Sequence, residues 1–205
     1  MIPLSTAMRP KTLDEFYGQE HFLYKGSLLY NSIKNKTFES AIFYGPSGTG
    51  KTTLARMIAS EMDAGFKEIN ASTAGTKELK EILEDARFKF FGLQNQTTYL
   101  YVDELHRWNK LQQDSLLKAL EEGVIRFIGS TTENPYFSIN NAIISRVRLL
   151  YEFRRHEKKD IVAILHRALE DAENGLANYG LAYDEEAIEL IADLCGGDAR
   201  VALDT

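Results

Sequence analysis

The feature that most constrains this chain is the stretch GPSGTGKT at residues 45–52. An apolar run, AIFY at 41–44, precedes it, and a helical pattern, TTLARMIASEM at 52–62, follows. The stretch matches the phosphate-binding pattern G-x-x-x-x-G-K-[ST] in the strand–loop–helix context that this pattern requires. Its glycines let backbone N–H groups converge on phosphate oxygens, and the helix adds its dipole. A glycine-rich turn that binds nothing is the alternative, which the flanking elements disfavour.

Each part of this loop has an expected task. Lys51 would reach the β- and γ-phosphates of ATP, and the Thr52 hydroxyl would hold Mg²⁺. We therefore expect ATP and Mg²⁺ as cofactors. The predicted nucleotide-binding residues of the segment are Gly45, Pro46, Ser47, Gly48, Thr49, Gly50, Lys51, Thr52 and Thr53.

Short apolar runs alternate with helical patterns through the first three quarters of the chain. Such alternation predicts an α/β fold, in which a parallel sheet carries helices on both faces. The expected strands are 41–44, 66–70, 98–102, 124–128 and 149–153, and the expected helices between them are 51–62, 76–90 and 109–122.

The pattern changes near Arg154, where charge clusters and no further strand is expected. Helices are predicted at about 157–174 and at 184–195, with Asp184 as an N-cap and Gly196-Gly197 as a stop. Asp198 would cap another helix, of which the sequence contains barely two turns. We expect a nucleotide-binding domain at 1–153 and a small helical lid domain, truncated, at 154–205.

Composition limits the classes of partner. The net charge of −6 gives no global basic field for coating DNA, although a local basic surface stays open. A single cysteine, Cys195, excludes an intramolecular disulfide and a multi-cysteine zinc site, which fits a reducing cytoplasm. We expect Cys195 in the core of the helical domain and no membrane-spanning segment.

Two acids follow the predicted strand at 98–102. Asp103 would help to hold Mg²⁺, and Glu104 would orient and deprotonate an attacking water. Two solvated carboxylates at a strand end are the alternative, which the phosphate loop disfavours. An acid positioned to activate water favours hydrolysis of ATP over transfer of its phosphoryl group to a small-molecule acceptor. Nearby His106 is expected to be a packing or hydrogen-bonding residue rather than a catalyst.

The stretch GSTTENPYF at 129–137 follows the strand expected at 124–128. An Asn-Pro pair alone usually starts a turn. If this strand lies beside the one that ends at Asp103, Asn134 would reach the γ-phosphate and hydrogen-bond the attacking water. We expect this functional role for Asn134.

Two arginines are candidates to stabilise the transferred phosphoryl group. Arg146 follows a short helical pattern, and Arg200 lies in the first turn of the final helix. Arg148 competes with Arg146 for the role, and each could be a surface arginine without one.

Together the motifs resemble an AAA+ ATPase of the clamp-loader branch, and more narrowly the replication-associated recombination protein A family. The resemblance rests on MRPKTLDEFYGQEHFL at 8–23, the loop at 45–55, DELHRWNKLQQDSLLKALEEG at 103–123, GSTTENPYF and GDAR at 197–200. It covers nearly the whole chain, and HRWNKLQQD combined with TTENP is its most specific part.

The resemblance implies a role for each candidate residue. Gly45–Thr52 would be Walker A, Asp103 and Glu104 Walker B, Asn134 sensor 1, Arg146 the arginine finger and Arg200 sensor 2. It also implies that the first 22 residues wrap the adenine, with Arg9, Pro10, Tyr17 and Gly18 nearest to it.

The implied function is a DNA-dependent ATPase at stalled or damaged replication forks, in recombination and replication restart. Its expected partners are forked, gapped or end-containing DNA, copies of itself held by a C-terminal domain, and candidates among single-strand-binding protein and replisome components. The implied location is cytoplasmic, near the nucleoid. Lys77 and Lys80 would face DNA phosphate, although a solvated helix face explains them as well.

Two other readings stay open. A Holliday-junction branch-migration motor shares the opening RPKTLDEFYGQE but differs at TTENP. An ATP-switched assembly module would bind nucleotide and hardly turn it over, and the intact Asp103, Glu104 and Arg146 argue against it.

Overall fold

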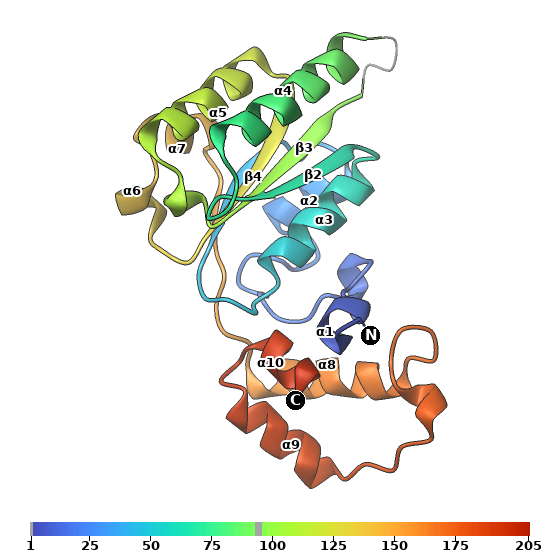
Figure 1. Cartoon of the computed structure of the whole chain (residues 1–205). Helices are drawn as coiled ribbons and strands as arrows, with labels where there is room; N and C mark the ends of the chain where they lie inside the picture. The colour runs from blue at the N-terminus through green and yellow to red at the C-terminus, as the bar shows by residue number, and fades with distance from the viewer. Residues whose placement is uncertain (1, 93–95) are drawn as a thin grey trace.

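The computed structural model describes residues 2–92 and 96–205 and shows a five-stranded parallel sheet (Figure 1). Its strands are β1 (Ala41–Tyr44), β2 (Gly65–Asn70), β3 (Thr98–Asp103), β4 (Ile125–Thr131) and β5 (Leu150–Glu152), in the order β2-β3-β4-β1-β5. The predicted α/β class and all five predicted strands are therefore confirmed. The order places β4 between β3 and β1, so the ends of three strands meet beside the phosphate loop.

The predicted end of β4 was wrong by three residues. The strand continues from Ile128 to Thr131 because Gly129, Ser130 and Thr131 pair with Ile42, Phe43 and Tyr44 of β1. Ser130 and Thr131 are fully buried there. Their polar side chains made this segment look like a loop, whereas the pairing with β1 holds it in the sheet.

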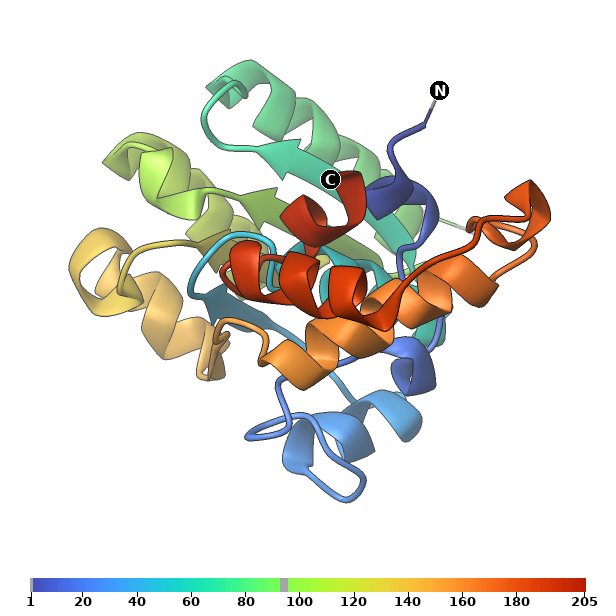
Figure 2. The same cartoon turned by 90° about the horizontal axis from the view of Figure 1, so that it is seen from below.

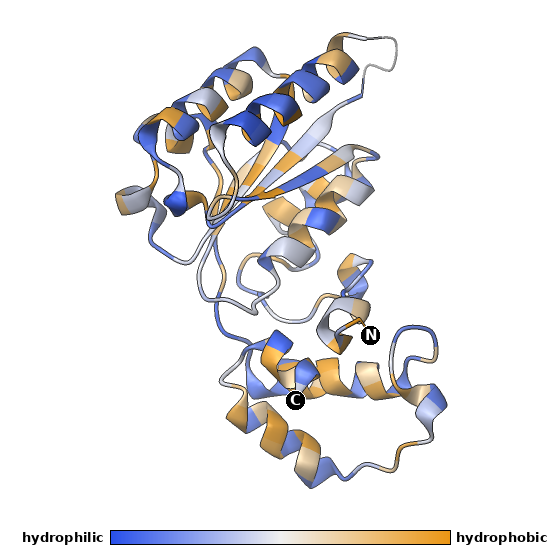
Figure 3. Ribbon diagram, viewed as in Figure 1, coloured by the Kyte–Doolittle hydropathy of each residue, from blue (hydrophilic) through white to orange (hydrophobic). Residues whose placement is uncertain are grey.

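Helices cover both faces of the sheet. One layer contains α2 (Leu28–Lys34) and α3 (Lys51–Glu61), and the other contains α4 (Thr76–Phe91), α5 (Lys110–Glu122) and α7 (Asn141–Val147). Alternate residues of β3 point to opposite layers. Tyr99 and Tyr101 pack with the first layer, and Leu100 and Val102 pack with the second. Hydrophobic residues accordingly concentrate along the strands, while the outer sides of α4 and α5 are largely hydrophilic (Figure 3).

The lid contains α8 (Lys158–Glu170), η3 (Ala177–Tyr179), α9 (Glu185–Leu194) and α10 (Ala199–Asp204). Its own small core includes Ile161, Ile188 and Cys195, so the expected burial of the cysteine is confirmed. The predicted caps are also confirmed, since Asp184 accepts from the Glu186 N–H and Asp198 accepts from the N–H groups of Arg200 and Val201.

The predicted C-terminal end of the first lid helix was wrong. The helix α8 ends at Glu170 rather than near residue 174. The Asp171 carboxylate accepts hydrogen bonds from the N–H groups of Glu173 and Asn174, each at 2.8 Å. Such a side-chain turn offers the backbone an alternative to helix, so the chain leaves the helical path there.

The N-terminal segment lies between the two sets of elements, with α1 (Leu4–Ala7) beside α10 in both views (Figures 1 and 2). The 3-10 turn η1 (Leu13–Glu15) follows, and Glu15 pairs with Arg167 of α8 at 3.1 Å. The Gln19 side chain donates to the Arg154 carbonyl at 2.7 Å and accepts from its N–H at 2.9 Å. Nε2 of His21 lies 2.7 Å from the Glu152 carbonyl of β5, so the segment touches both the sheet and the lid.

The remaining short elements are η2 (Leu105–Arg107), directly after β3, and α6 (Pro135–Ser138), after β4. Within the described residues, no helix is long and apolar enough to cross a membrane.

Candidate nucleotide-binding site

The phosphate loop turns sharply between β1 and α3. Gly45 has a φ of +132°, and a Cβ there would lie 2.1 Å from the Phe153 carbonyl oxygen. Gly48 has a φ of +69°, and a Cβ there would overlap the carboxylate of Asp198. Both positions thus need glycine for backbone conformation and for space.

Lys51 begins α3 and is almost fully buried. Its ammonium donates to the carbonyls of Gly45 at 2.8 Å and Pro46 at 2.6 Å. Burial lowers the pKa of Lys51 to about 8, although the carboxylates of Asp103 and Glu104 act in the opposite direction. An anion bound at this loop would stabilise the charged ammonium, which is the form that contacts phosphate.

Asp103 is joined to the loop through two residues that the sequence patterns did not single out. Its Oδ1 accepts from the Ser130 hydroxyl of β4 and from the Tyr101 hydroxyl at 3.4 Å. The Tyr101 hydroxyl also lies 2.9 Å from the Thr52 hydroxyl. Burial raises the pKa of Tyr101, so its phenol stays protonated and able to donate. Thr52 and Asp103 are thereby held on the same side of the sheet.

Glu104 follows on a left-handed backbone, with a φ of 55°. Such a conformation is uncommon for a residue with a side chain and directs this one away from the strand path. Its carboxylate is 29% exposed, and one oxygen lies 3.3 Å from the Nε2 atom of His106. Glu104 is therefore partly accessible to water at the end of β3.

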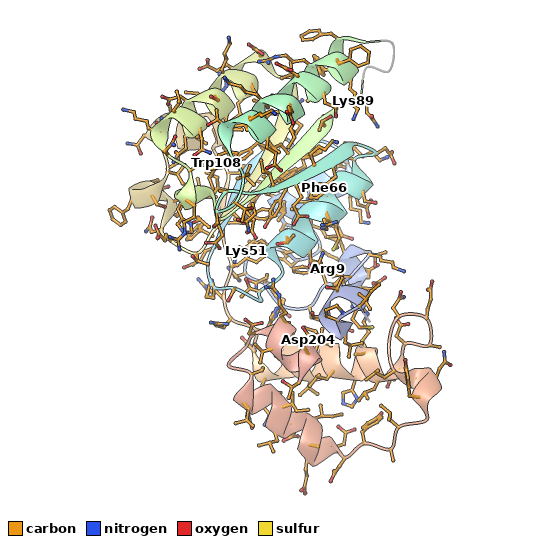
Figure 4. All side chains as sticks on the ribbon, in the orientation of Figure 1. Arg9, Lys51, Phe66, Lys89, Trp108 and Asp204 are labelled. Carbon is orange, nitrogen blue, oxygen red and sulfur yellow. The ribbon has the colours of Figure 1, made fainter. Side chains whose placement is uncertain are left out.

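A cavity of about 480 Å³ joins these residues to the lid and the N-terminal segment. The region between the sheet and the lid contains Lys51, Arg9 and Asp204 (Figure 4). The predicted residues that line the cavity are Arg9, Pro10, Tyr17, Ser47, Gly48, Thr49, Gly50, Lys51, Thr52, Thr53, Asp103, Glu104 and Arg200. Among the further lining residues are Met8, Phe16, Glu68, Thr132, His156, Ile164 and Leu203.

The placement of Asn134 differs from the expected one. Its side-chain oxygen accepts from the Tyr136 N–H at 3.0 Å and caps α6, which is the ordinary role of an Asn-Pro turn. The residue that lines the cavity at the end of β4 is Thr132. The difference arises because β4 runs to Thr131, which carries Asn134 past the cavity.

Four other predicted catalytic or nucleotide-binding residues do not line the cavity: Gly45 and Pro46 at the start of the loop, Gly18 and Arg146. Gly18 instead packs against His156, and a Cβ at Gly18 would lie 2.6 Å from Nδ1 of that ring. Arg146 is exposed near the end of α7 and donates to the Glu121 carbonyl at 3.3 Å. Its guanidinium is thus free to meet another molecule rather than its own phosphate loop.

The lid touches the phosphate loop through residues that were not among the predicted site residues. The Ala199 N–H donates to the Gly48 carbonyl at 3.1 Å, and Arg155 donates to the Ser47 carbonyl at 3.3 Å. Arg155 also lies 3.6 Å from the Asp198 carboxylate. Only the GDAR stretch gave a signal for this contact, and it pointed to Arg200.

Lys77 and Lys80 lie at the start of α4, away from the cavity, and both are exposed. The side chain of Lys77 is 91% exposed and lies 3.8 Å from Glu81, one turn along the helix. Among residues 2–92 and 96–205, no ion pair is recorded for Lys80, and contact of these two lysines with DNA stays a prediction.

The comparisons with known proteins agree with this geometry. The Holliday junction DNA helicase RuvB P-loop domain matches residues 8–141. The chain belongs to this family. A RuvB structure from Thermotoga maritima, described as a Holliday junction branch migration motor, has a TM-score of 0.77 and 27% identity, and the match covers 96% of this chain and 63% of that one.

Relatives outside RuvB itself are more similar in sequence. Replication-associated recombination protein A of Escherichia coli strain K12 is 43% identical over 207 residues, 99% of this chain and 45% of that protein. ATPase WRNIP1 of Dictyostelium discoideum is 41% identical over 202 residues, 98% of this chain and 22% of that protein. The chain thus spans less than half the length of these curated relatives. The resemblance that the motifs indicated and the AAA+ fold are confirmed.

The site has suitable oxygen donors for Mg²⁺. This cation takes oxygen ligands, commonly one or two protein oxygens together with nucleotide phosphates. The Thr52 hydroxyl and the Asp103 carboxylate supply such oxygens, tied together through Tyr101. No cluster of three or more His, Cys, Asp or Glu side chains suited to a metal occurs within residues 2–92 and 96–205. The site therefore fits a cation that enters with a nucleotide.

Proposed function

We propose that this chain is the ATP-hydrolysing module of a DNA-dependent AAA+ ATPase that acts at stalled or damaged replication forks. One observation carries the ATPase part: Lys51, Thr52, Asp103 and Glu104 line a single cavity between the sheet and the lid. The fork and recombination part is supported by the 43% identity to replication-associated recombination protein A. The proposed units are a nucleotide domain at 1–153 and a lid at 154–205.

In the proposed mechanism the loop backbone and Lys51 hold the phosphates of ATP. Thr52 and Asp103 hold Mg²⁺, which when bound neutralises phosphate charge. Glu104 accepts the proton of the attacking water, for which its partly exposed carboxylate is suited. Thr132 is the better-placed polar group at the end of β4, whereas Asn134 shapes the turn.

Arg200 and Arg146 would act at different active sites, the first in its own chain and the second in a neighbouring copy. Arg200 lines the cavity from the lid, and its charge contributes to the lowered pKa of Lys51, behind the larger effect of burial. Arg200 would therefore contact the phosphates of its own chain. Arg146 is exposed and outside the cavity, so it would complete the site of a neighbouring copy in an oligomer.

The N-terminal segment would hold the base. Arg9, Pro10 and Tyr17 line the cavity together with Ile164 and Leu203 of the lid. These residues give a mixed apolar and polar enclosure, as a purine base requires. The proposed location of the protein is the cytoplasm, where nucleotide and DNA are both present.

The test is nucleotide binding and hydrolysis by the full-length protein, with and without forked, gapped and blunt DNA. Lys51→Ala should abolish Mg-ATP binding, because it removes the buried ammonium at the phosphate loop. DNA should raise the hydrolysis rate of the unchanged protein. Tight binding with little hydrolysis, in the presence or absence of DNA, would favour the ATP-switched assembly module instead.

A further inference from the structure

His106 lies directly behind Glu104, in the 3-10 turn that follows β3. Its side chain is only 4% exposed. The Nδ1 atom lies 2.9 Å from the hydroxyl of Thr131, the last residue of β4. The Nε2 atom lies 3.3 Å from Oε2 of Glu104. A buried ring with a partner at each nitrogen has a fixed orientation.

The direction of the hydrogen bonds follows from the surroundings of Thr131. Its hydroxyl oxygen accepts from the Glu133 N–H at 3.0 Å, so donating its own proton to Nδ1 of His106 lets the hydroxyl act once as acceptor and once as donor. A neutral imidazole that accepts at Nδ1 carries its proton at Nε2. That N–H faces the Glu104 carboxylate. The opposite tautomer would set a nitrogen lone pair against a carboxylate oxygen, which is unfavourable.

We infer that His106 is a positioning residue for Glu104, holding one carboxylate oxygen so that the other faces the attacking water. The inference rests on the proposed role of Glu104 as the base. In the described part of the chain, the His106 ring is the side-chain partner recorded for this carboxylate. Without it, a 29% exposed carboxylate on a left-handed residue would sample several rotamers. Holding the Glu104 side chain in one rotamer favours hydrolysis because the base is already oriented toward the water.

Glu133 is the other acid near the ring. Its Oε1 lies 3.7 Å from Nε2, and its side chain is 57% exposed. The greater distance and exposure make it the weaker partner of His106. The chain of contacts therefore runs from the end of β4, through Thr131 and His106, to Glu104, and joins the ends of the neighbouring strands β4 and β3.

Two amide variants separate the two contacts of the ring. In His106→Gln the side-chain amide reaches about as far as Nε2, so it can still donate to Glu104. In His106→Asn the shorter side chain reaches about as far as Nδ1, so it keeps Thr131 and loses Glu104. Single-turnover ATP hydrolysis, nucleotide affinity and the thermal unfolding midpoint are measured for both in the full-length protein, together with His106→Ala and Glu133→Gln.

We expect His106→Asn and His106→Ala to slow hydrolysis by about 10- to 100-fold, the range for a lost polar contact to a charged group. Nucleotide affinity should stay within about threefold, because the residue does not touch the phosphates. His106→Gln should recover most of the rate, and Glu133→Gln should stay within about threefold of the unchanged protein. Adding His106→Asn to Glu104→Gln should slow hydrolysis no further.

Equal rates for the Gln and Asn variants, or an undiminished rate for His106→Ala, would overturn the positioning role. Additive losses in the double variant would do the same. Hydrolysis that Glu104→Gln leaves unchanged would instead count against the proposed function. The two failures are thus distinguishable in one set of measurements.

Discussion

The hydroxyl of Ser5 donates a 2.6 Å hydrogen bond to the carboxylate of Asp204, across 199 positions of sequence. The Ser5 N–H donates to the other oxygen of the same carboxylate at 2.9 Å. Both residues line the cavity, so the first helix and the last helix meet over its rim. This clasp joins the N-terminal segment to the lid on the side where we place the base.

Removing the clasp should shorten the time that nucleotide stays bound. Ser5→Ala deletes the hydroxyl donor and leaves the N–H contact, so the lid should open more often. We expect nucleotide dissociation to speed up by about threefold, a modest effect because the pair is partly exposed. Stopped-flow release of a fluorescent ATP analogue measures it. Ser60→Ala, at an exposed position of α3, is the matched control, and equal release rates for both variants would contradict the clasp.

The clasp also predicts a pH dependence of stability. Hydrogen bonds from the Ser5 hydroxyl and N–H lower the pKa of Asp204 below its ordinary 3.8, with a smaller contribution from Arg200. The unfolded chain therefore binds the proton first as pH falls. The stabilisation is present above pH 3.8 and is lost as pH falls through the lower pKa of the folded state.

Urea unfolding of the chain between about pH 3 and pH 6 tests this dependence. Asp204→Asn should lower the free energy of unfolding at the upper end of that range, and the difference from the unchanged chain should shrink toward the lower end. Asp14→Asn, at an exposed position of the same N-terminal region, is the control. A difference that stays constant over the whole range would show that the Asp204 carboxylate is not linked to folding.

The lysines at the start of α4 give a prediction about DNA. Reversing the charge of Lys77 and Lys80 to Glu should weaken DNA binding by the full-length protein. The slope of the logarithm of the binding constant against the logarithm of the salt concentration should become shallower by about two. Basal ATP hydrolysis should change little, because neither residue lines the cavity. The same reversal at Lys34 and Lys36, on the opposite helical layer, is the control. Equal slopes for the two double variants would favour a solvated helix face.

The exposed position of Arg146 predicts that active sites are shared between copies. Full-length Arg146→Ala and full-length Lys51→Ala should each be inactive alone, because each lacks one half of every site. Mixed together they should recover part of the activity, since some interfaces pair an intact loop with an intact arginine. Arg148→Ala is the control, because that residue is also exposed at the end of α7. A mixture that stays inactive would contradict the assignment of Arg146.

The fold was predictable from sequence because its strands are short buried runs and its phosphate loop has fixed chemistry. The site was predictable only where one motif carries the residue, as for Lys51, Asp103 and Glu104. Tyr101 escaped notice because a tyrosine in a strand is ordinary core, and only the structure brings its hydroxyl to Thr52. The Ser5–Asp204 contact joins the two ends of the chain, so patterns of neighbouring residues in the sequence cannot predict it.

The role of Asn134 at the phosphates stays a prediction, and the position of this residue depends on where β4 ends. The polar run after Ile128 looked like the end of a strand, so Asn134 was expected near the phosphates. Pairing with β1 extends the strand to Thr131, which brings Thr132 to the cavity and leaves Asn134 to cap the next helix. A strand end depends on the neighbouring strand, which sequence patterns do not show.

The most direct test of the account separates ATP binding from ATP hydrolysis at Glu104. Glu104→Gln keeps the size of the side chain and removes the base. We predict that single-turnover hydrolysis falls by about 10² or more while the affinity for Mg-ATP stays within a few-fold. An equal loss of binding and hydrolysis would show that Glu104 is structural, and unchanged hydrolysis would contradict its role as the base.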